Sequence, residues 1–212
     1  MNSEQFVTGL VLGAGSSTRL GRAKQLLPYG DTTLLGHVLE TARACHFDQI
    51  VVALGAAAEE VRAKLELAGA DVVVNDAPAA GCSSSIAAAL AAVDRRSDLL
   101  VLMLADQPGV SAETVAALRA GRGAAPLAVC RYEDGRGHPI AFARSVFDEL
   151  GALHGDRGVW RLLERRAAEV AEVAIAGPVP LDVDTPADYE AVLLHAGLAV
   201  TGGAGAPAAI LR

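Results

Sequence analysis

The sequence has few aromatic residues, few cysteines and no long apolar run. Phe, Trp and Tyr make up 4% of the 212 residues, and Ala, Val and Leu take their place. The three cysteines are odd in number and far apart, which argues against a disulfide framework or a zinc site and favours reduced thiols. No apolar run approaches the roughly 20 residues that span a bilayer, so no membrane partner is expected.

An excess of basic residues is also missing. The chain carries 18 Lys and Arg against 25 Asp and Glu, a net charge of −7, so bulk attraction to nucleic acid is not expected. No basic region precedes the first apolar stretch, which argues against a signal peptide and for a cytoplasmic protein. We expect one domain over residues 1–196 and a mobile, low-complexity tail over 197–212.

Positive charge is instead concentrated in one loop near the N-terminus. Three glycines follow an apolar run, residues 6–12, that is typical of a buried first strand. Glycine lets backbone N–H groups face a ligand, and consecutive N–H groups form an anion-binding concavity. Arg19, Arg22 and Lys24 add positive charge, and no acidic residue stands among them. The loop therefore predicts phosphate binding.

The two common phosphate-binding loops do not fit this stretch. The dinucleotide-binding fingerprint needs a third glycine where Thr18 stands. The nucleoside triphosphatase loop ends in Gly-Lys-Ser/Thr, whereas Gly21 is followed here by Arg22-Ala23-Lys24. What remains over residues 12–24 is Leu-x-Ala-Gly-x-x-x-Arg-Leu-Gly-x-x-Lys, followed by Gln-Leu-Leu-Pro.

Apolar and amphipathic segments alternate through the first half of the chain. Strands are expected at 6–12, 49–54, 71–74 and 99–104, and helices at 33–45, 59–67, 83–93 and 111–120. This alternation predicts an α/β fold with a mostly parallel sheet covered by helices and 99–104 as its central strand. After residue 125 we expect a hairpin (127–131 and 138–143), helices at 145–150 and 158–166, a strand at 170–175 and a final helix to about 195.

Three aspartates are candidate metal ligands. Ligands of such sheets bind beyond the carboxyl ends of the strands, and Asp106 directly follows the expected central strand. A carboxylate there can hold Mg²⁺ against a substrate phosphate, although a turn or cap aspartate is the alternative. Asp182 and Asp184 stand two apart, so in an extended segment both point to one face. They complete a magnesium site with Asp106, or Asp184 helps to begin the last helix.

Two further polar segments lie in expected loops. Ser83, Ser84 and Ser85 enter a helix, where they bind a base edge or phosphate, or where Ser83 is a plain N-cap. Arg136 and His138 stand together in the Arg-Gly-His-Pro turn and are equally compatible with substrate contact and with a structural role.

Together these motifs resemble the MobA-like nucleotidyltransferases. Besides the first loop, the chain has Gly-x-Ser-Ser-Ser at 81–85, Leu-x-Asp-Gln-Pro at 104–108, Arg-Gly-His-Pro at 136–139, Gly-Asp-x-Gly at 155–158 and Leu-Asp-Val-Asp-Thr-Pro at 181–186. In this order they are similar to the molybdenum cofactor cytidylyltransferase (MocA-type) branch over about residues 7–195. Ala14 agrees with the cytidylyl branch, whereas Gly13 agrees with neither the cytidylyl nor the guanylyl branch.

The resemblance implies a three-layer, Rossmann-like nucleotidyltransferase fold with a small β-hairpin and helical part for the acceptor. It implies Mg²⁺-dependent transfer of CMP from CTP to the terminal phosphate of a molybdopterin-type cofactor, with release of pyrophosphate. A molybdoenzyme or its chaperone would then be a further partner. The alternatives are the same chemistry with GTP or another phosphorylated acceptor, and an NAD(P)H-dependent oxidoreductase of the MobA-like type.

The resemblance also implies roles for individual residues. The expected nucleotide-binding residues are Leu12, Gly13, Ala14, Gly15, Ser16, Arg19, Lys24, Ser83, Ser84, Ser85 and Asp106. Among them, Arg19, Lys24 and Asp106 are the expected catalytic residues. Mg²⁺ is expected on Asp106 with Asp182 or Asp184. The expected acceptor-binding residues are Arg136, His138 and Asp156, although Asp156 is also placed to cap the helix that follows it.

Overall fold

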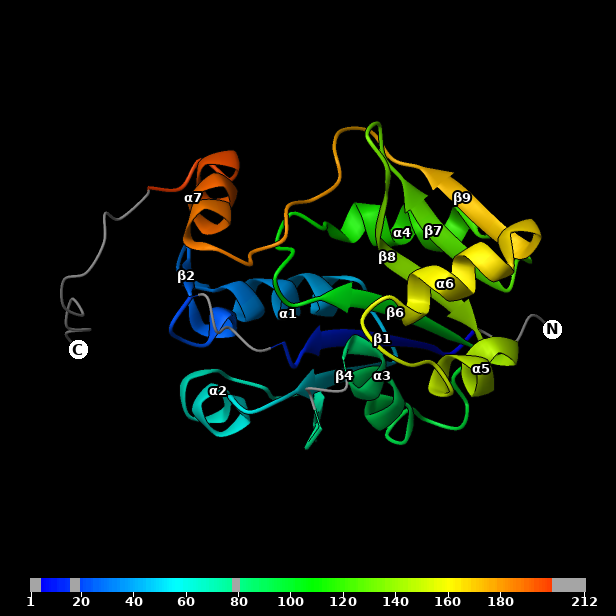
Figure 1. The fold of residues 1–212 in the computed structure, drawn as a ribbon, viewed down its shortest axis with the longest axis horizontal. Coiled ribbons are helices and arrows are strands. Elements are labelled where there is room, and N and C mark those ends of the chain that lie inside the picture. Colours follow the sequence, from blue (N-terminus) through cyan, green and yellow to red (C-terminus); the bar gives the residue numbers. More distant parts are fainter. Residues whose placement is uncertain (1–4, 16–19, 78–80, 200–212) are drawn as a thin grey trace.

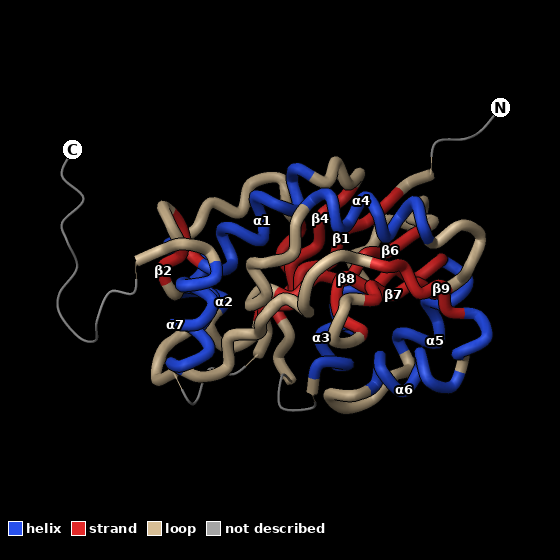
Figure 2. Tube along the Cα trace, turned by 90° about the horizontal axis from the view of Figure 1, so that it is seen from above, coloured by secondary structure: helices blue, strands red, loops and turns tan. Residues whose placement is uncertain are grey.

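A computed structural model of the chain describes residues 5–15, 20–77 and 81–199 (Figures 1 and 2). Its centre is a seven-stranded sheet in the order β5-β4-β1-β6-β8-β7-β9. The strands of this sheet are β1 (Val7–Gly13), β4 (Gln49–Leu54), β5 (Asp71–Val74), β6 (Leu99–Leu104), β7 (Leu127–Arg131), β8 (Arg136–Ala143) and β9 (Val170–Ala174). The helices are α1 (Leu34–Ala44), α2 (Ala58–Lys64), α3 (Cys82–Leu90), α4 (Ala112–Gly121), α5 (Phe147–Gly151), α6 (Gly158–Arg165) and α7 (Pro186–His195).

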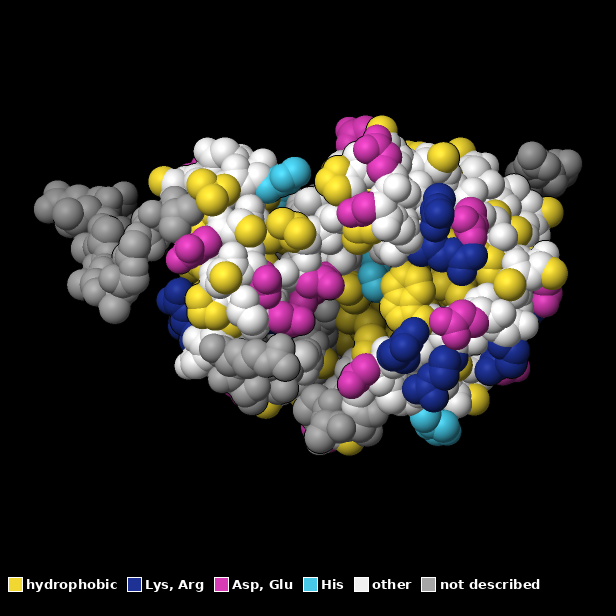
Figure 3. All heavy atoms as spheres, turned by 45° about the horizontal axis from the view of Figure 1, so that its top comes forward, with side chains coloured by type: hydrophobic (Ala, Val, Ile, Leu, Met, Phe, Trp, Pro, Cys, Tyr) yellow, Lys and Arg dark blue, Asp and Glu magenta, His cyan; other side chains and the backbone are white. Residues whose placement is uncertain are grey.

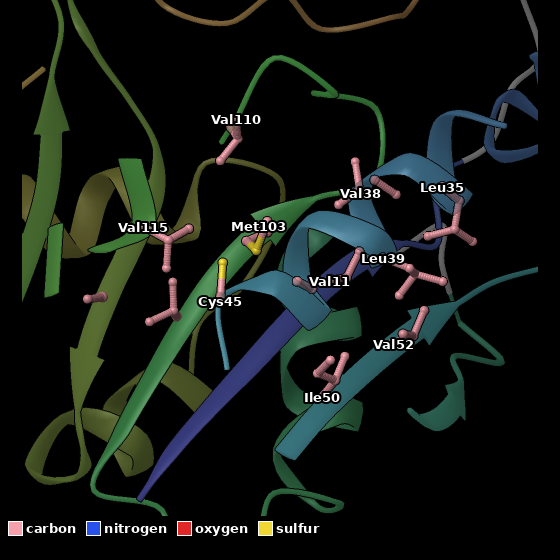
Figure 4. Close-up of a cluster of buried hydrophobic side chains, with 14 of the residues drawn as sticks. Val11, Leu35, Val38, Leu39, Cys45, Ile50, Val52, Met103, Val110 and Val115 are labelled. Atoms are coloured by element: carbon pink, nitrogen blue, oxygen red, sulfur yellow. The ribbon is translucent and has the colours of Figure 1, made fainter. Parts of the chain in front are cut away.

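The predicted central strand, β6, is buried on both faces. Successive residues of a strand point to opposite sides. Leu99, Val101 and Met103 pack in the cluster that α1 and α4 cover (Figure 4). Leu100 and Leu102 pack on the other face, under α3, α5 and α6. One apolar run therefore serves two cores, which confirms the three-layer α/β fold.

The hairpin predicted after residue 125 is part of this central sheet. β8 pairs antiparallel with both β6 and β7, and β9 returns parallel to β7. Among the strands described in this sheet, only β8 runs against the others. Because Leu102 pairs with Ile140, the first residues of β8 lie beside the carboxyl end of β6. β8 begins at Arg136, two residues before the predicted start at 138.

A third cluster holds the last helix against the N-terminal half of the chain. A small hairpin that the sequence analysis did not predict, β2 (Pro28–Tyr29) with β3 (Thr32–Thr33), lies beside it. The buried members of the cluster are Leu27, Tyr29, Leu34, Val183, Val192 and Leu193. Thr185 and Asp188 form a capping box at the start of α7, as the Thr-Pro pair predicts. This packing fixes residues 182–184 near the glycine-rich loop.

Helices α2 and α3 end before their predicted ends, because the apolar sequence pattern continues beyond the last helical residue. α2 ends at Lys64, since Leu65 is already extended, and α3 ends at Leu90. No helix in the described ranges is both long and apolar enough to cross a membrane. Residues 200–212 of the expected mobile tail lie outside the described part of the chain.

Candidate functional site

The glycine-rich loop begins where three parallel strands end together. Gly13 of β1 is level with Leu54 of β4, and Leu12 is level with Leu104 of β6. A Cβ atom on Gly55 would lie 2.7 Å from the carbonyl oxygen of Ala14, so glycine is required where these two loops touch. Of the predicted nucleotide-binding residues, Leu12, Gly13, Ala14 and Gly15 lie at this edge. Ser16 and Arg19 lie outside the described residues.

A buried glutamine, Gln25, forms hydrogen bonds to the backbone of the glycine-rich loop. The Gln25 side chain is 2% exposed, and its Nε2 atom donates to the carbonyl oxygens of Gly13 and Gly15. The sequence analysis included Gln25 in the motif but assigned it no role. Its only signal was its position directly after Lys24. Its contacts indicate that it sets the shape of the loop.

Lys24 connects the loop to two of the predicted metal ligands. Its Nζ atom lies 2.5 Å from Oδ2 of Asp106 and 2.9 Å from Oδ1 of Asp184. Burial works to lower the pKa of Lys24, but the charges and hydrogen bonds of Asp106 and Asp184 outweigh it and raise the pKa above its ordinary value. The ammonium therefore remains charged and joins three segments that are far apart in sequence.

Asp182 and Asp184 stand on either side of a fully buried residue. Val183 packs in the third cluster, and its N–H donates to the carbonyl oxygen of Asp106 at 3.2 Å. Part of Asp182 is open to solvent, but burial of its carboxyl, followed by the negative charge of Asp106, raises its pKa to about 6. Within the described residues, no three such side chains are arranged as a ready metal site. The Lys24 ammonium bridges two of the predicted ligands instead.

The three predicted serines use their hydroxyls within the protein. Ser83 donates to the carbonyl oxygen of Gly155 at 2.6 Å. The Nδ2 atom of Asn75 donates to Ser84 at 2.8 Å and to Ser85 at 2.9 Å. Ser83 and Ser85 are buried. These bonds hold the start of α3 in place, and the nucleotide-binding role of the three serines stays a prediction.

Asp156 caps a different helix from the one that follows it. Its Oδ1 atom accepts a hydrogen bond from the backbone N–H of Cys82, the first residue of α3, at 3.0 Å. The N-cap of α6, Arg157, makes no side-chain capping bond. Asp156 thus ties the segment before α6 to the start of α3.

Replacing Gly81 with alanine is expected to lower the melting temperature by about 3–10 °C, from a backbone cost of about 1–3 kcal/mol. Gly81 has φ +92° and ψ 176°, a conformation that is essentially restricted to glycine. Its new Cβ atom would also lie 2.7 Å from Oδ1 of Asp156. Gly69→Ala is the matched control, because Gly69 has φ +80° but no atom within 4 Å of its Cβ position. A loss in calorimetry no larger than that of Gly69→Ala would contradict an added cost from this close approach.

A pocket of about 290 Å³ lies beside the aspartates. Its walls are Cys82, Leu102, Leu104, Gln107, Arg136, Gly137, His138, Asp156, Val159, Trp160, Val179 and Asp182. All three predicted acceptor-binding residues are among them. Asp182, one of the predicted metal ligands, also lines the pocket. Figure 3 shows the hollow, with hydrophobic side chains inside, a histidine at its edge and basic side chains on either side.

Two ring side chains meet in this pocket. The His138 and Trp160 rings are 5.7 Å apart between centroids and inclined by 77°. Burial lowers the pKa of His138 to about 4, so its imidazole is uncharged near neutral pH. The sequence analysis missed Trp160, for which the only signal was that it is the one tryptophan of the chain.

Comparison with known proteins places this chain in a family. Residues 9–170 match the MobA-like NTP transferase domain. Nicotine blue oxidoreductase of Paenarthrobacter nicotinovorans is 34% identical over 171 residues, which cover 76% of this chain and 82% of that protein. The purine catabolism protein PucB of Bacillus subtilis (strain 168) is 30% identical over 204 residues, covering 88% and 96%.

Solved structures agree with these sequence matches. Rv0371c from Mycobacterium tuberculosis H37Rv is 49% identical with a TM-score of 0.86, covering 91% of this chain and 99% of its own. Its complex with manganese is 48% identical with a TM-score of 0.82, covering 90% and 99%. The family match spans more than half of the chain. The chain is therefore an enzyme of the nucleotidyltransferase class and belongs to the MobA-like NTP transferase family.

Proposed function

We propose that this nucleotidyltransferase transfers CMP from CTP to the terminal phosphate of a molybdopterin-type cofactor and releases pyrophosphate. The observation that carries the proposal is the position of the Lys24 ammonium. Lys24 is the last residue of the glycine-rich loop, and its ammonium lies between Asp106 and Asp184. Ala14 supports CTP, since it agrees with the cytidylyl branch. The Arg-Gly-His-Pro motif supports the acceptor, since Arg136 and His138 line the pocket beside Asp182.

The two substrates would approach the aspartates from two sides. The loop of residues 13–24 would take the triphosphate through its backbone N–H groups. The pocket would take the acceptor, with its phosphate at the Asp182 end. Holding both reactants in one geometry replaces an encounter in solution, which can supply several kcal/mol of the barrier.

The main task of the chain's own residues would be to offset the negative charges of the two substrates. An acceptor phosphate is already an anion, so it needs no strong general base. It must nevertheless approach a triphosphate that is also anionic. Lys24 and the loop N–H groups would offset this repulsion and stabilise the charge that develops on the departing pyrophosphate.

The aspartates also fit a divalent cation. Asp106 and Asp184 offer hard oxygen ligands around one ammonium. Asp182 is close enough to Asp106 for that negative charge to add to burial in raising its pKa. Mg²⁺ in such enzymes is commonly bound by one or two carboxylates plus substrate phosphates. Asp106 with Asp182 or Asp184 would hold it, and it would add positive charge against the triphosphate. The manganese complex of Rv0371c supports a divalent ion in this family.

A second candidate is an oxidoreductase that uses a nicotinamide cofactor. It is favoured by the 34% identity to nicotine blue oxidoreductase. Thr18 argues against it, because the dinucleotide-binding fingerprint needs glycine at that position. GTP, or a different phosphorylated acceptor, would keep the transfer chemistry and change the product.

Thermal unfolding with and without Mg²⁺ in the presence of CTP, GTP, ATP, UTP or NADPH separates these candidates. A ligand at 100 times its dissociation constant stabilises the folded state by about 2.7 kcal/mol, which is easily measured. We expect a Mg²⁺-dependent rise in melting temperature with CTP. A rise with GTP alone would retain nucleotidyl transfer and reject CTP. A rise with NADPH alone would reject nucleotidyl transfer in favour of the oxidoreductase.

A further inference from the structure

The pocket beside the aspartates is separate from the glycine-rich loop. None of the loop residues that the structure describes lines it. Leu104 and Asp182 line the part of the pocket nearest to Asp106. Leu104 is the last residue of β6, two residues before Asp106, and the negative charge of Asp106 acts on Asp182. A molecule in this pocket would therefore reach the reaction centre along a path other than the triphosphate loop.

Three polar side chains of the pocket, Gln107, Arg136 and Asp156, form bonds within the protein. Arg136 forms an ion pair with Glu172 of β9. The Asp156 carboxylate caps α3, and the Nε2 atom of Gln107 donates to the carbonyl oxygen of Pro180 at 3.2 Å, whereas its buried Oε1 atom has no hydrogen-bond partner among the described residues. A sugar would need hydrogen-bond partners for several hydroxyl groups. The surface that remains for a ligand consists mainly of apolar walls and the two rings.

Both ring side chains of this surface have contacts within the protein. Trp160 lies on α6 and packs against the second hydrophobic cluster. The backbone of His138 is fixed by the Tyr132 hydroxyl, which donates to its carbonyl oxygen at 2.7 Å. The two rings meet nearly at right angles, an arrangement that aromatic pairs prefer. A flat ring entering the pocket would find rigid aromatic and aliphatic surfaces.

We propose that Trp160 determines acceptor specificity: the pocket takes a planar heteroaromatic ring system stacked on Trp160, with the acceptor's phosphate directed past Asp182 toward Asp106. This inference rests on the proposed nucleotidyl transfer and adds a residue that neither the motifs nor the family match singles out. The pocket of about 290 Å³ is at the small end of ligand sites, which suits a fused ring pair. His138 beside Trp160 is uncharged near neutral pH and adds no positive charge to the ring surface, and Arg136 in the same pocket is paired with Glu172.

Intrinsic fluorescence tests the stacking directly, because Trp160 is the single tryptophan of the chain. A pterin monophosphate is expected to quench the emission saturably, after correction for light absorption with free N-acetyltryptophanamide. Ribose 5-phosphate is expected to leave it unchanged. CTP with Mg²⁺ should neither quench it nor displace the pterin. Absence of saturable pterin quenching would overturn the inference, as would competition between CTP and the pterin for this pocket.

Kinetics of two variants give an independent test. Trp160→Leu is expected to raise the KM for the acceptor about tenfold, the scale of losing one stacking partner, with the KM for CTP unchanged. Trp160→Phe keeps a ring and should stay within about threefold of the parent enzyme. Phe147→Leu is the matched control, since Phe147 packs on the same hydrophobic cluster but does not line the pocket.

The outcomes separate this inference from the proposed function. An unchanged acceptor KM in Trp160→Leu, with the CTP-dependent thermal shift intact, rejects the role of Trp160 and leaves nucleotidyl transfer standing. Absence of any CTP-dependent shift in the parent protein rejects the proposed function itself. An equal rise in acceptor KM in the leucine and phenylalanine variants points to loss of local packing and rejects stacking.

Discussion

Replacing Lys24 with alanine is expected to lower kcat by about 10²-fold or more, the scale of removing one charge-stabilising donor. The Lys24 ammonium is bound by Asp106 and Asp184, and its raised pKa keeps it charged across the neutral range. The same charge would face the triphosphate during turnover. Pyrophosphate release, measured with CTP and acceptor at saturation, checks the prediction.

A second measurement shows that the loss arises at this site. Without the ammonium, Asp106 and Asp184 lose their shared cation, so the variant should bind Mn²⁺ alone more tightly than the parent protein does. Lys64→Ala is the matched control, because Lys64 is the only other lysine and forms an exposed ion pair with Glu60 on α2. Near-normal turnover of Lys24→Ala would remove Lys24 from the mechanism.

Replacing Asp106 with alanine is expected to abolish Mg²⁺-dependent turnover, with a loss of about 10³-fold or more, since metal-ion charge is worth several kcal/mol to such a transition state. The Asp106 side chain is 15% exposed and stands at the end of the central strand, where the loop, β6 and residues 182–184 meet. The fold should persist, because Lys24 keeps its partner Asp184. Circular dichroism and turnover at several Mg²⁺ concentrations measure both effects.

Asp106→Asn keeps the shape of the side chain and removes its charge, so it should fail almost as completely as the alanine variant. Asp31→Asn is the matched control, since Asp31 is exposed in the turn between β2 and β3. If higher Mg²⁺ concentrations restored full turnover to Asp106→Asn, the aspartate would contribute affinity alone. If the asparagine variant were fully active at ordinary Mg²⁺, Asp106 would not be a metal ligand.

Most helices and strands followed from local patterns. The apolar run at 99–104 predicted the central strand because it can be buried on both faces, and its residues are divided between two clusters. Thr185 followed by Pro186 predicted the start of α7 because capping depends on neighbouring residues only. The spacing of two predicted that Asp182 and Asp184 project to one side, and the structure buries Val183 between them.

Features that depend on the order of strands could not be predicted in this way. The hairpin after residue 125 was expected, but its insertion beside β6 was not, and this insertion brings His138 next to the end of the central strand. The capping of α3 by Asp156 joins residues 74 positions apart. Gln107 stands in a quoted motif and Trp160 is the one tryptophan, but neither signal placed them in a pocket, because lining a pocket is a property of the assembled walls.

The sequence by itself determined which candidate functional groups this protein has. These are a glycine-rich loop with basic residues, an aspartate after the central strand and a pair of aspartates before the last helix. Only the tertiary structure decided that Lys24 lies between Asp106 and Asp184, which are 82 and 160 residues away along the chain. The physical reason is that local backbone preferences act over a few residues. Contacts across such distances arise from burial of the sheet and of Val183, which no short motif encodes.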